Sequence, residues 1–470
     1  MRSGIKKLLP VLLALGSLAA SAAEKSLAPT ADGYRGIWFT LGQFSKYGDK
    51  YSGGLGTYTA NHEPMAVYAP QVNKTFFTYG GTVPGQRHLL IMVAYYDHQT
   101  GTVPRPVVVY DKMDVNDPHD NACINIDDQG YIWVFISGRN VVRLGLKFRS
   151  REPFSIAAFD RVEEKVMTYP QAWYLPGQGW FHLFTKYAPA SRPGFYAREL
   201  YWQTSADGKT WTGDRKLAGF GGHYQVSGVC GRKIGSFFNF HPGGDVDKRS
   251  NLYYAQTEDF GQTWTTVDGQ LIELPLHEVK NPALVFDFQA QGKLMYTCDL
   301  NFDRAGYPLL LYVTSRGAQP GPDNDPRELC LSRWDGKTWQ TSVISKVGHN
   351  YAMGSLWVDG DEWKVIAPTG TGPQPLGSGG EMCLWVSKNQ GKSWAMKKQL
   401  TRASPMNHNY ARRPLNARDP FFTFWADGNP DKFSESHLYF GDASGKRVWQ
   451  LPYAMTNSTA KPVLIQFNVP

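Results

Sequence analysis

Histidine, arginine and tyrosine side chains recur at short spacing in this sequence, and together they could transfer protons on an anionic substrate. His119 stands in Asn-Asp-Pro-His-Asp-Asn, and Arg139 follows the next apolar run. Further along, Tyr187 and Arg198 flank a turn between two apolar segments. Imidazole titrates near neutral pH, so a positioned histidine can give or take a proton. A guanidinium beside it is suited to binding a carboxylate.

The elements that position these residues follow from a repeat. Seven tetrads share one column, in which five of the eleven histidines stand first, and successive first positions are 49 to 69 residues apart. A short apolar run follows each tetrad. A period in this range indicates an array of similar supersecondary units. The tetrads begin at His62, His119, Thr168, His223, Lys280, His349 and His408.

Seven strand-rich units predict an all-β, seven-bladed β-propeller in which each tetrad precedes the innermost strand of a blade. The tetrads would then meet at one mouth of the central channel and line a substrate site. A structural interpretation competes, because buried polar groups at strand starts must be hydrogen-bonded in any case. The structural interpretation is favoured for a typical first residue of the seven tetrads. For His119 with Arg139 the functional interpretation is favoured, and for Arg412 with Arg413 the two stay open.

A second repeat runs in phase with the first. Asp or Asn, then Gly, then Trp recur in Ser205–Trp211, Thr257–Trp264, Ser332–Trp339 and Ser387–Trp394, with a degenerate copy in Asp442–Trp449. These segments resemble Asp-boxes, the hairpin turns of sialidase-type (BNR) propellers. Asp or Asn and Gly suit such turns through side-chain-to-backbone bonds and positive φ. We expect them to be structural.

Longer segments resemble one carbohydrate-active BNR propeller family. The similarity begins with Gly33-Tyr-Arg-Gly-Ile-Trp-Phe-Thr-Leu-Gly-Gln and continues through the tetrads at His119, His223 and His408, so it covers nearly the whole mature chain. That family contains L-rhamnose-α-1,4-D-glucuronate lyases and a related α-L-rhamnosidase, which act on acidic side chains of gum arabic and arabinogalactan. More distantly, the chain is similar to the seven-bladed ulvan lyases.

The resemblance implies roles for individual residues. In the ulvan lyases a histidine, a tyrosine and an arginine carry out the elimination, and they map onto His119, Tyr187 and Arg198. A second histidine of that pattern is replaced by Arg139. The resemblance therefore implies a polysaccharide lyase acting at a uronic acid, with His119 or Tyr187 as the base. The expected substrate-binding residues are Arg139, Asn121, His62, His223, Tyr224, His349, His408 and Arg412.

Two other functions stay open at the sequence level. Hydrolysis in this family depends on one histidine on the opposite face of the propeller, and the alignment places Gln43 there, with His62 as a competing position. Gln43 favours the lyase over the α-L-rhamnosidase. The third interpretation is a non-catalytic glycan-binding propeller, since the same fold hosts unrelated functions. A sialidase is less favoured, because its three-arginine site cannot be assembled from this sequence.

The N-terminus predicts export. Basic residues, the apolar run Leu8–Ala19 and small residues up to Ala22 have the order of a secretory signal peptide. We therefore expect a signal peptide over 1–22 and one catalytic domain over 23–470, secreted to the periplasm or outside the cell. The apolar run is too short to span a bilayer.

The charge favours an acidic partner. The formal net charge is +8, and no Lys/Arg run or nucleic-acid-binding motif is present. We expect an acidic polysaccharide or oligosaccharide as substrate, no nucleic acid, no membrane span and a monomer. The elimination requires no metal or other cofactor, although a cluster of histidines has room for a structural or assisting cation.

Overall fold

Strands form nearly all of the regular structure. The computed structural model describes residues 27–55, 61–86, 88–115, 117–189, 194 and 196–465. Within these ranges, no helix is long and apolar enough to cross a membrane. The predicted signal peptide lies outside the described residues. The expectation of an all-β protein is confirmed. The 3-10 turns that lie wholly within the described residues are η2 (Pro118–Asp120), η3 (Pro242–Gly244), η4 (Val246–Lys248) and η5 (Pro322–Asn324).

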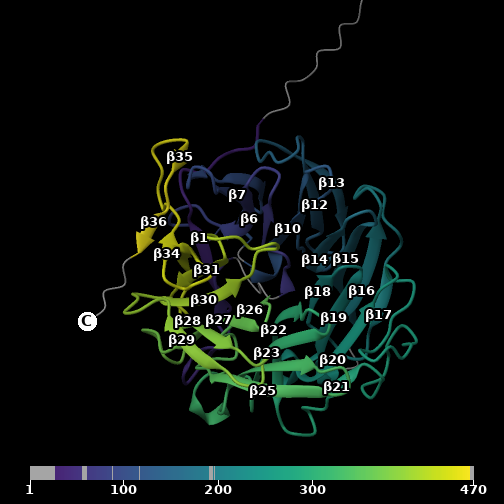
Figure 1. Cartoon of the computed structure of the whole chain (residues 1–470). Helices are drawn as coiled ribbons and strands as arrows, with labels where there is room; N and C mark the ends of the chain where they lie inside the picture. Colours follow the sequence, from purple (N-terminus) through teal and green to yellow (C-terminus); the bar gives the residue numbers. More distant parts are fainter. Residues whose placement is uncertain are drawn as a thin grey trace, which may run out of the picture.

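Six antiparallel sheets have the regular pattern of a propeller blade, and they surround a common centre (Figure 1). Five of them contain four consecutive strands each, and the sixth contains five strands. Their strands are β10–β13 (Ala122–Ile126, Ile132–Ile136, Gly145–Ser150, Phe159–Lys165), β14–β17 (Thr168–Leu175, Gly179–Pro189, Tyr196–Ser205, Arg215–Ala218), β18–β21 (Gln225–Cys230, Lys233–Phe240, Ser250–Thr257, Leu284–Phe286), β22–β25 (Leu294–Phe302, Pro308–Ser315, Glu328–Trp334, Trp339–Lys346), β26–β29 (Ser355–Asp359, Glu362–Gly370, Glu381–Ser387, Ala395–Gln399) and β30, β31, β33, β34, β36 (Asn407–Arg412, Thr423–Gly428, Leu438–Gly441, Val448–Gln450, Val463–Ile465).

The expectation of a seven-bladed propeller is wrong, because within the described ranges only six of the sheets form blades. The first unit is merged into a seven-stranded sheet, because β1 pairs with β6 on one side and with β32 on the other. The propeller therefore has six regular blades and one composite sheet. The composite sheet contains β1 (Gly36–Thr40), β4 (Ser52–Gly53), β5 (Ala66–Ala69), β6 (Lys74–Gly81), β7 (Leu90–Asp97), β9 (Val107–Asp111) and β32 (Ser434–Ser436). Two small pairs are β2–β3 (Phe44–Ser45, Gly48–Asp49) and β8–β35 (Val103–Pro104, Thr459–Ala460).

The composite sheet also closes the ring. The backbone N–H of Tyr68, in β5, donates to the carbonyl of Leu415 at 2.9 Å, and the N–H of Leu415 donates to the carbonyl of Ala66 at 2.8 Å. Leu415 follows β30, so the first and last units are joined at the channel. The remaining innermost strands β10, β14, β18, β22 and β26 contact one another in turn.

Face-to-face packing of the sheets explains the continuous apolar strands. Every residue of β11 is buried, as is every residue of β23. A strand covered on both faces needs apolar side chains on both, so period-two alternation is lost. β29, at the outer edge of its sheet, shows the reverse, with four of its five residues exposed.

The Asp-boxes are the turns that the sequence predicts. In the box between β16 and β17, Asp207 Oδ1 accepts from the backbone N–H of Thr210 at 2.7 Å, and Ser205 Oγ accepts from the N–H of Gly208 at 2.8 Å. Gly208 has φ +72°, and a Cβ there would lie 2.5 Å from the Trp133 ring. Glycine is therefore required by both the backbone and the packing.

The tetrads lie where they were expected in six of seven cases. Each of the six stands just before or at the start of an innermost strand. The tetrad at Lys280 is the exception, because it leads into β21, the outermost strand of its sheet. The innermost strand of the next sheet is β22, whose start carries no tetrad-like sequence. The apolar pattern of the sequence alone does not show whether the innermost strand of a blade begins at β21 or at β22.

Candidate active site

A cavity of about 620 Å³ lies where the ends of β11, β15 and β16 meet the segment 41–51 and the turns η3 and η4. Its lining contains more cationic than anionic side chains, and it is rich in tyrosine. This composition suits an anionic ligand with apolar ring faces. The cations are Lys50, Arg139, Arg143, Arg198 and Arg249, the acids are Asp117 and Asp245, and the tyrosines are Tyr51, Tyr187, Tyr196, Tyr224 and Tyr351.

Asp117, His119 and Arg139 form the first polar cluster of the cavity. One carboxylate oxygen of Asp117 contacts His119 Nδ1, and the other contacts Arg139 Nη1. Asp117 is also the N-cap of η2 and accepts from the backbone N–H of His119 at 3.0 Å. A carboxylate at Nδ1 fixes the tautomer in which Nδ1 carries the proton and Nε2 the lone pair.

The electrostatics of this cluster keep the imidazole neutral. Burial lowers the pKa of His119 to about 4, although Asp117 opposes the shift. For Asp117, burial favours the protonated form, but His119 and then Arg139 outweigh it and hold the pKa of the carboxyl far below its ordinary value. At neutral pH the pair is therefore a neutral imidazole bonded to a carboxylate, the arrangement of a general base.

Three further charges hold Asp117 in place. Arg143 Nη2 lies 2.7 Å from Asp117 Oδ2 and 2.7 Å from Asp120 Oδ2. Asp120 is fully buried and accepts from Lys112 Nζ at 2.5 Å. The chain of alternating charges leaves Asp117 little freedom to rotate.

Arg198 forms the second polar cluster with two phenols. Its Nη2 donates to the Tyr187 hydroxyl at 2.6 Å, and its Nη1 donates to the Tyr224 hydroxyl at 3.1 Å. Tyr187 and Arg198 are cross-strand partners in β15 and β16. Arg198 is 6 % exposed, and its guanidinium carbon lies 4.6 Å from the centre of the Tyr187 ring. The guanidinium is thus positioned by aromatic groups.

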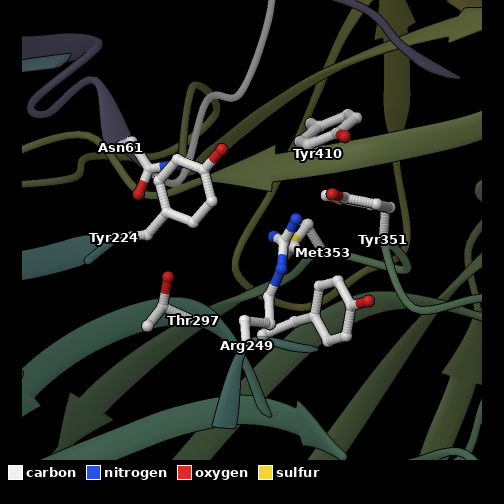
Figure 2. A pocket seen from close by; sticks show the side chains of 8 residues that line it. Asn61, Tyr224, Arg249, Thr297, Tyr351, Met353 and Tyr410 are labelled. Atoms are coloured by element: carbon white, nitrogen blue, oxygen red, sulfur yellow. The ribbon is translucent and has the colours of Figure 1, made fainter. Parts of the chain in front are cut away.

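A smaller pocket continues inward from the cavity and shares Tyr224, Arg249 and Tyr351 with it. Figure 2 shows the Arg249 guanidinium between the rings of Tyr224 and Tyr351, close to Met353. The guanidinium carbon lies 4.8 Å from the Tyr224 ring centre and 5.5 Å from that of Tyr351. The floor of the cavity is therefore cationic and faced by aromatic rings.

The family can be stated from sequence comparison. Residues 78–347, more than half of the chain, match the model of the BNR repeat-containing family. The chain belongs to this BNR repeat-containing family. No curated protein matches it.

Solved structures similar to this BNR propeller include two polysaccharide lyases. One is an ulvan lyase bound to -[GlcA(1-4)Rha3S]-, with 16% identity, a TM-score of 0.65 and coverage of 89% of this chain and 94% of that chain. The other is the polysaccharide lyase Uly1, with 13% identity, a TM-score of 0.59 and coverage of 91% and 99%. At these identities the similarities establish the fold.

The BNR propeller brings five of the predicted site residues into the cavity. They come from the loop before β10, the end of β11, the strands β15 and β16, and the start of β18. They are His119, Arg139, Tyr187, Arg198 and Tyr224. Among the described residues, no group of three His, Cys, Asp or Glu side chains is arranged to hold a metal ion.

Six predicted substrate-binding residues lie outside the cavity. In the first half of the ring, Asn121 Nδ2 donates to the carbonyl of Leu55 at 2.6 Å. His62 is fully buried, with its ring 5.2 Å from that of Tyr169. His223 Nδ1 lies 2.7 Å from the carbonyl oxygen of Asn239, and burial lowers its pKa to about 4.

The other three of these predicted residues lie in the second half of the ring. His349 Nδ1 accepts from the backbone N–H of Tyr351 at 3.2 Å, and burial lowers the pKa of His349 to about 3. His408 bonds to Ser404 and Trp425. Arg412 pairs with Glu63 at 3.1 Å. These contacts match the structural interpretation, and none of these residues lines the cavity.

Gln43 also differs from expectation. It lines the same cavity as His119, and so it is not on an opposite face. Its backbone N–H donates to Asp49 Oδ1 at 3.0 Å, which fixes the segment against the cavity.

Sequence reasoning missed two tyrosines of the tetrads. Tyr351 and Tyr410 stand third in their tetrads, and both line the inner pocket together with Tyr224, which was predicted. The histidine that begins each of these tetrads lines neither the inner pocket nor the cavity. The tyrosines were visible in the aligned tetrads and could have been found there. Arg249 follows η4 and carries no comparable signal.

Proposed function

We propose that this chain is a secreted polysaccharide lyase that cleaves by β-elimination at glucuronic acid, at the L-rhamnose-α-1,4-D-glucuronate linkage of arabinogalactan and gum arabic. One observation carries the proposal: a neutral histidine–carboxylate pair and a phenol-bound arginine line one cationic cavity. The fold shared with solved polysaccharide lyases supports it. The choice of the rhamnose–glucuronate linkage rests on the resemblance of the sequence to the L-rhamnose-α-1,4-D-glucuronate lyases.

Neutralisation of the substrate carboxylate is the first requirement. The C5 proton of glucuronate is only weakly acidic until the charge that develops on the carboxylate is stabilised by preorganised donors. We assign this role to Arg198, with Arg139 assisting. Arg198 is held by Tyr187 and Tyr224, so it needs little rearrangement when the substrate binds.

Proton abstraction from C5 falls to His119. With its pKa lowered to about 4 by burial, the imidazole is neutral and ready to accept a proton at Nε2. Asp117 stabilises the imidazolium that forms. The electron pair of the C5–H bond becomes the C4=C5 double bond, and the C4–O4 bond breaks.

Tyr187 is the acid for the departing O4. Its oxygen accepts from Arg198 Nη2, so its own proton is directed to another acceptor. The rhamnose then leaves with O4 as its hydroxyl group, and the glucuronate becomes unsaturated. No metal or redox cofactor is needed to balance this reaction.

Incubation of the purified mature protein with gum arabic, and separately with ulvan, tests the proposal. New ultraviolet absorbance from an unsaturated uronate, with release of rhamnose from gum arabic, is the expected result. Free rhamnose beside saturated glucuronate would instead identify a hydrolase. Binding without any product would identify a glycan-binding propeller.

A further inference from the structure

A second concave site lies on the sheet β26–β29 and shares no lining residue with the catalytic cavity. It has a volume of about 430 Å³ and sits at the Asp-box turn between β28 and β29. Trp394, Lys388, Lys397 and Glu362 are among its lining residues. It therefore combines a large aromatic side chain with cations at an outer sheet edge.

Trp394 differs from the other Asp-box tryptophans. Within the described residues each of the other four has an aromatic or cationic partner against its ring, whereas Trp394 has none. Its Nε1 donates to Ser342 Oγ at 3.1 Å, and the side chain is only partly buried. The indole thus has a fixed orientation while part of it faces the hollow. The other four are Trp211, Trp264, Trp339 and Trp449.

The charged residues in the segment around Trp394 are all basic. Residues 388–402 contain five basic residues and no acidic one, and all five are exposed. Glu362, the one acid lining the hollow, lies 3.8 Å from Lys397 and 3.4 Å from Lys364. No ion pair involves Lys388 in the described part of the chain. The basic residues are Lys388, Lys392, Lys397, Lys398 and Arg402.

We propose that this hollow is an accessory binding site for acidic polysaccharide, which holds a segment of the polymer outside the catalytic cavity. The choice of an acidic polymer rests on the proposed function and on charge complementarity. The indole would cover the apolar face of a sugar ring. Lys388 and Lys397 would pair with carboxylates on either side of that ring.

The two kinds of contact contribute differently. Exposed ion pairs are weak and are screened by salt, so the lysines add a salt-dependent part of the affinity. The contact with Trp394 is apolar and persists at higher salt. A competing explanation is that the lysines only protect β29, an edge strand, from pairing with other chains.

Binding of intact gum arabic is the test, measured by affinity electrophoresis in a His119→Ala background so that no polymer is consumed. Trp394→Ala should weaken binding roughly tenfold, the scale of losing one aromatic anchor. The double variant Lys388→Glu/Lys397→Glu should weaken it as well and reduce its salt dependence. Lys337→Ala removes an exposed charge from a different Asp-box and is the matched control, with no expected change.

Thermal unfolding of each variant shows whether the fold is intact. Because Lys388 and Lys397 are exposed, the double variant reports on binding even if the Trp394 variant is unstable. Unchanged polymer binding in the folded double variant, or aggregation as its one new property, would overturn the proposal in favour of edge protection. This readout is binding, so it stands apart from whether the catalytic cavity proves to be a lyase site.

Discussion

His119 and His408 head equivalent tetrads on different blades, yet their surroundings differ. His119 bonds to a carboxylate and borders a cavity of about 620 Å³. Both ring nitrogens of His408 are used inside the protein, since Nδ1 accepts from Trp425 Nε1 at 3.0 Å and Nε2 lies 2.9 Å from Ser404 Oγ. The same residue at the same place in a repeat is thus a candidate base in one blade and a packing element in another.

Arginines show the same contrast. Arg198 is bound by two phenols at the edge of the cavity. Arg412 pairs with Glu63 and donates to the carbonyls of Cys298 and Gly354. Function in this ring therefore depends on where neighbouring loops leave space, more than on residue type. His119 and Arg198 line the cavity of about 620 Å³, whereas His408 and Arg412 do not.

The two largest expected effects on turnover are those of Arg198→Ala and His119→Ala. Loss of one preorganised donor to a developing charge costs about 10²–10³-fold in rate. For Arg198→Ala we expect a loss of at least this size in kcat/KM, measured from the absorbance of the unsaturated product. Arg412→Ala is the comparison. It leaves Glu63 buried without its partner, so it should lower the melting temperature, while the molecules that remain folded stay active. If Arg198→Ala and Arg412→Ala lost equal specific activity, the contrast between a cavity arginine and a buried structural arginine would be contradicted.

The histidine pair gives the second of these effects. Removal of a general base costs about 10²–10⁴-fold, so His119→Ala should lose most of its turnover while keeping its fold. His408→Ala leaves buried partners unsatisfied and should lower the free energy of unfolding by about 1–3 kcal/mol, with kcat nearly unchanged. Steady-state kinetics and denaturant unfolding of both variants measure this. Near-normal turnover in the His119 variant would remove it from the mechanism.

The sequence predicted the parts of the molecule that repeat. The Asp-boxes and six tetrads were located from their spacing, and His119 with Arg139 was singled out from its neighbours. Merging of the first unit with β1 and β32 was not predicted, because it depends on pairing between the two ends of the chain. The burial of His349 and the place of Arg249 in the lining of the cavity were missed for the same physical reason. Loops from distant segments decide which side chains they cover.

A shift in pH dependence tests the role of Arg139. If His119 is the base, kcat/KM of the native protein should fall only as the pH drops toward about 4. Arg139 is one of the cations that lower this pKa, and its Nη1 lies 3.2 Å from His119 Nδ1. Arg139→Gln should therefore raise the pKa of His119 and move the acid limb to higher pH. An unmoved acid limb would show that another group titrates.

Gln43→Ala should have the smallest effect. The backbone of Gln43 is held by Asp49 whether or not the side chain is present, so the variant loses at most one neutral hydrogen bond to the substrate. Such a bond contributes about 0.5–1.5 kcal/mol, which corresponds to roughly a two- to twelvefold rise in KM with the same unsaturated product. Gln43→His is the sharper comparison, because the family resemblance connects a histidine here with hydrolysis. If that variant released saturated glucuronate, Gln43 would control the chemistry of the cavity and not only binding.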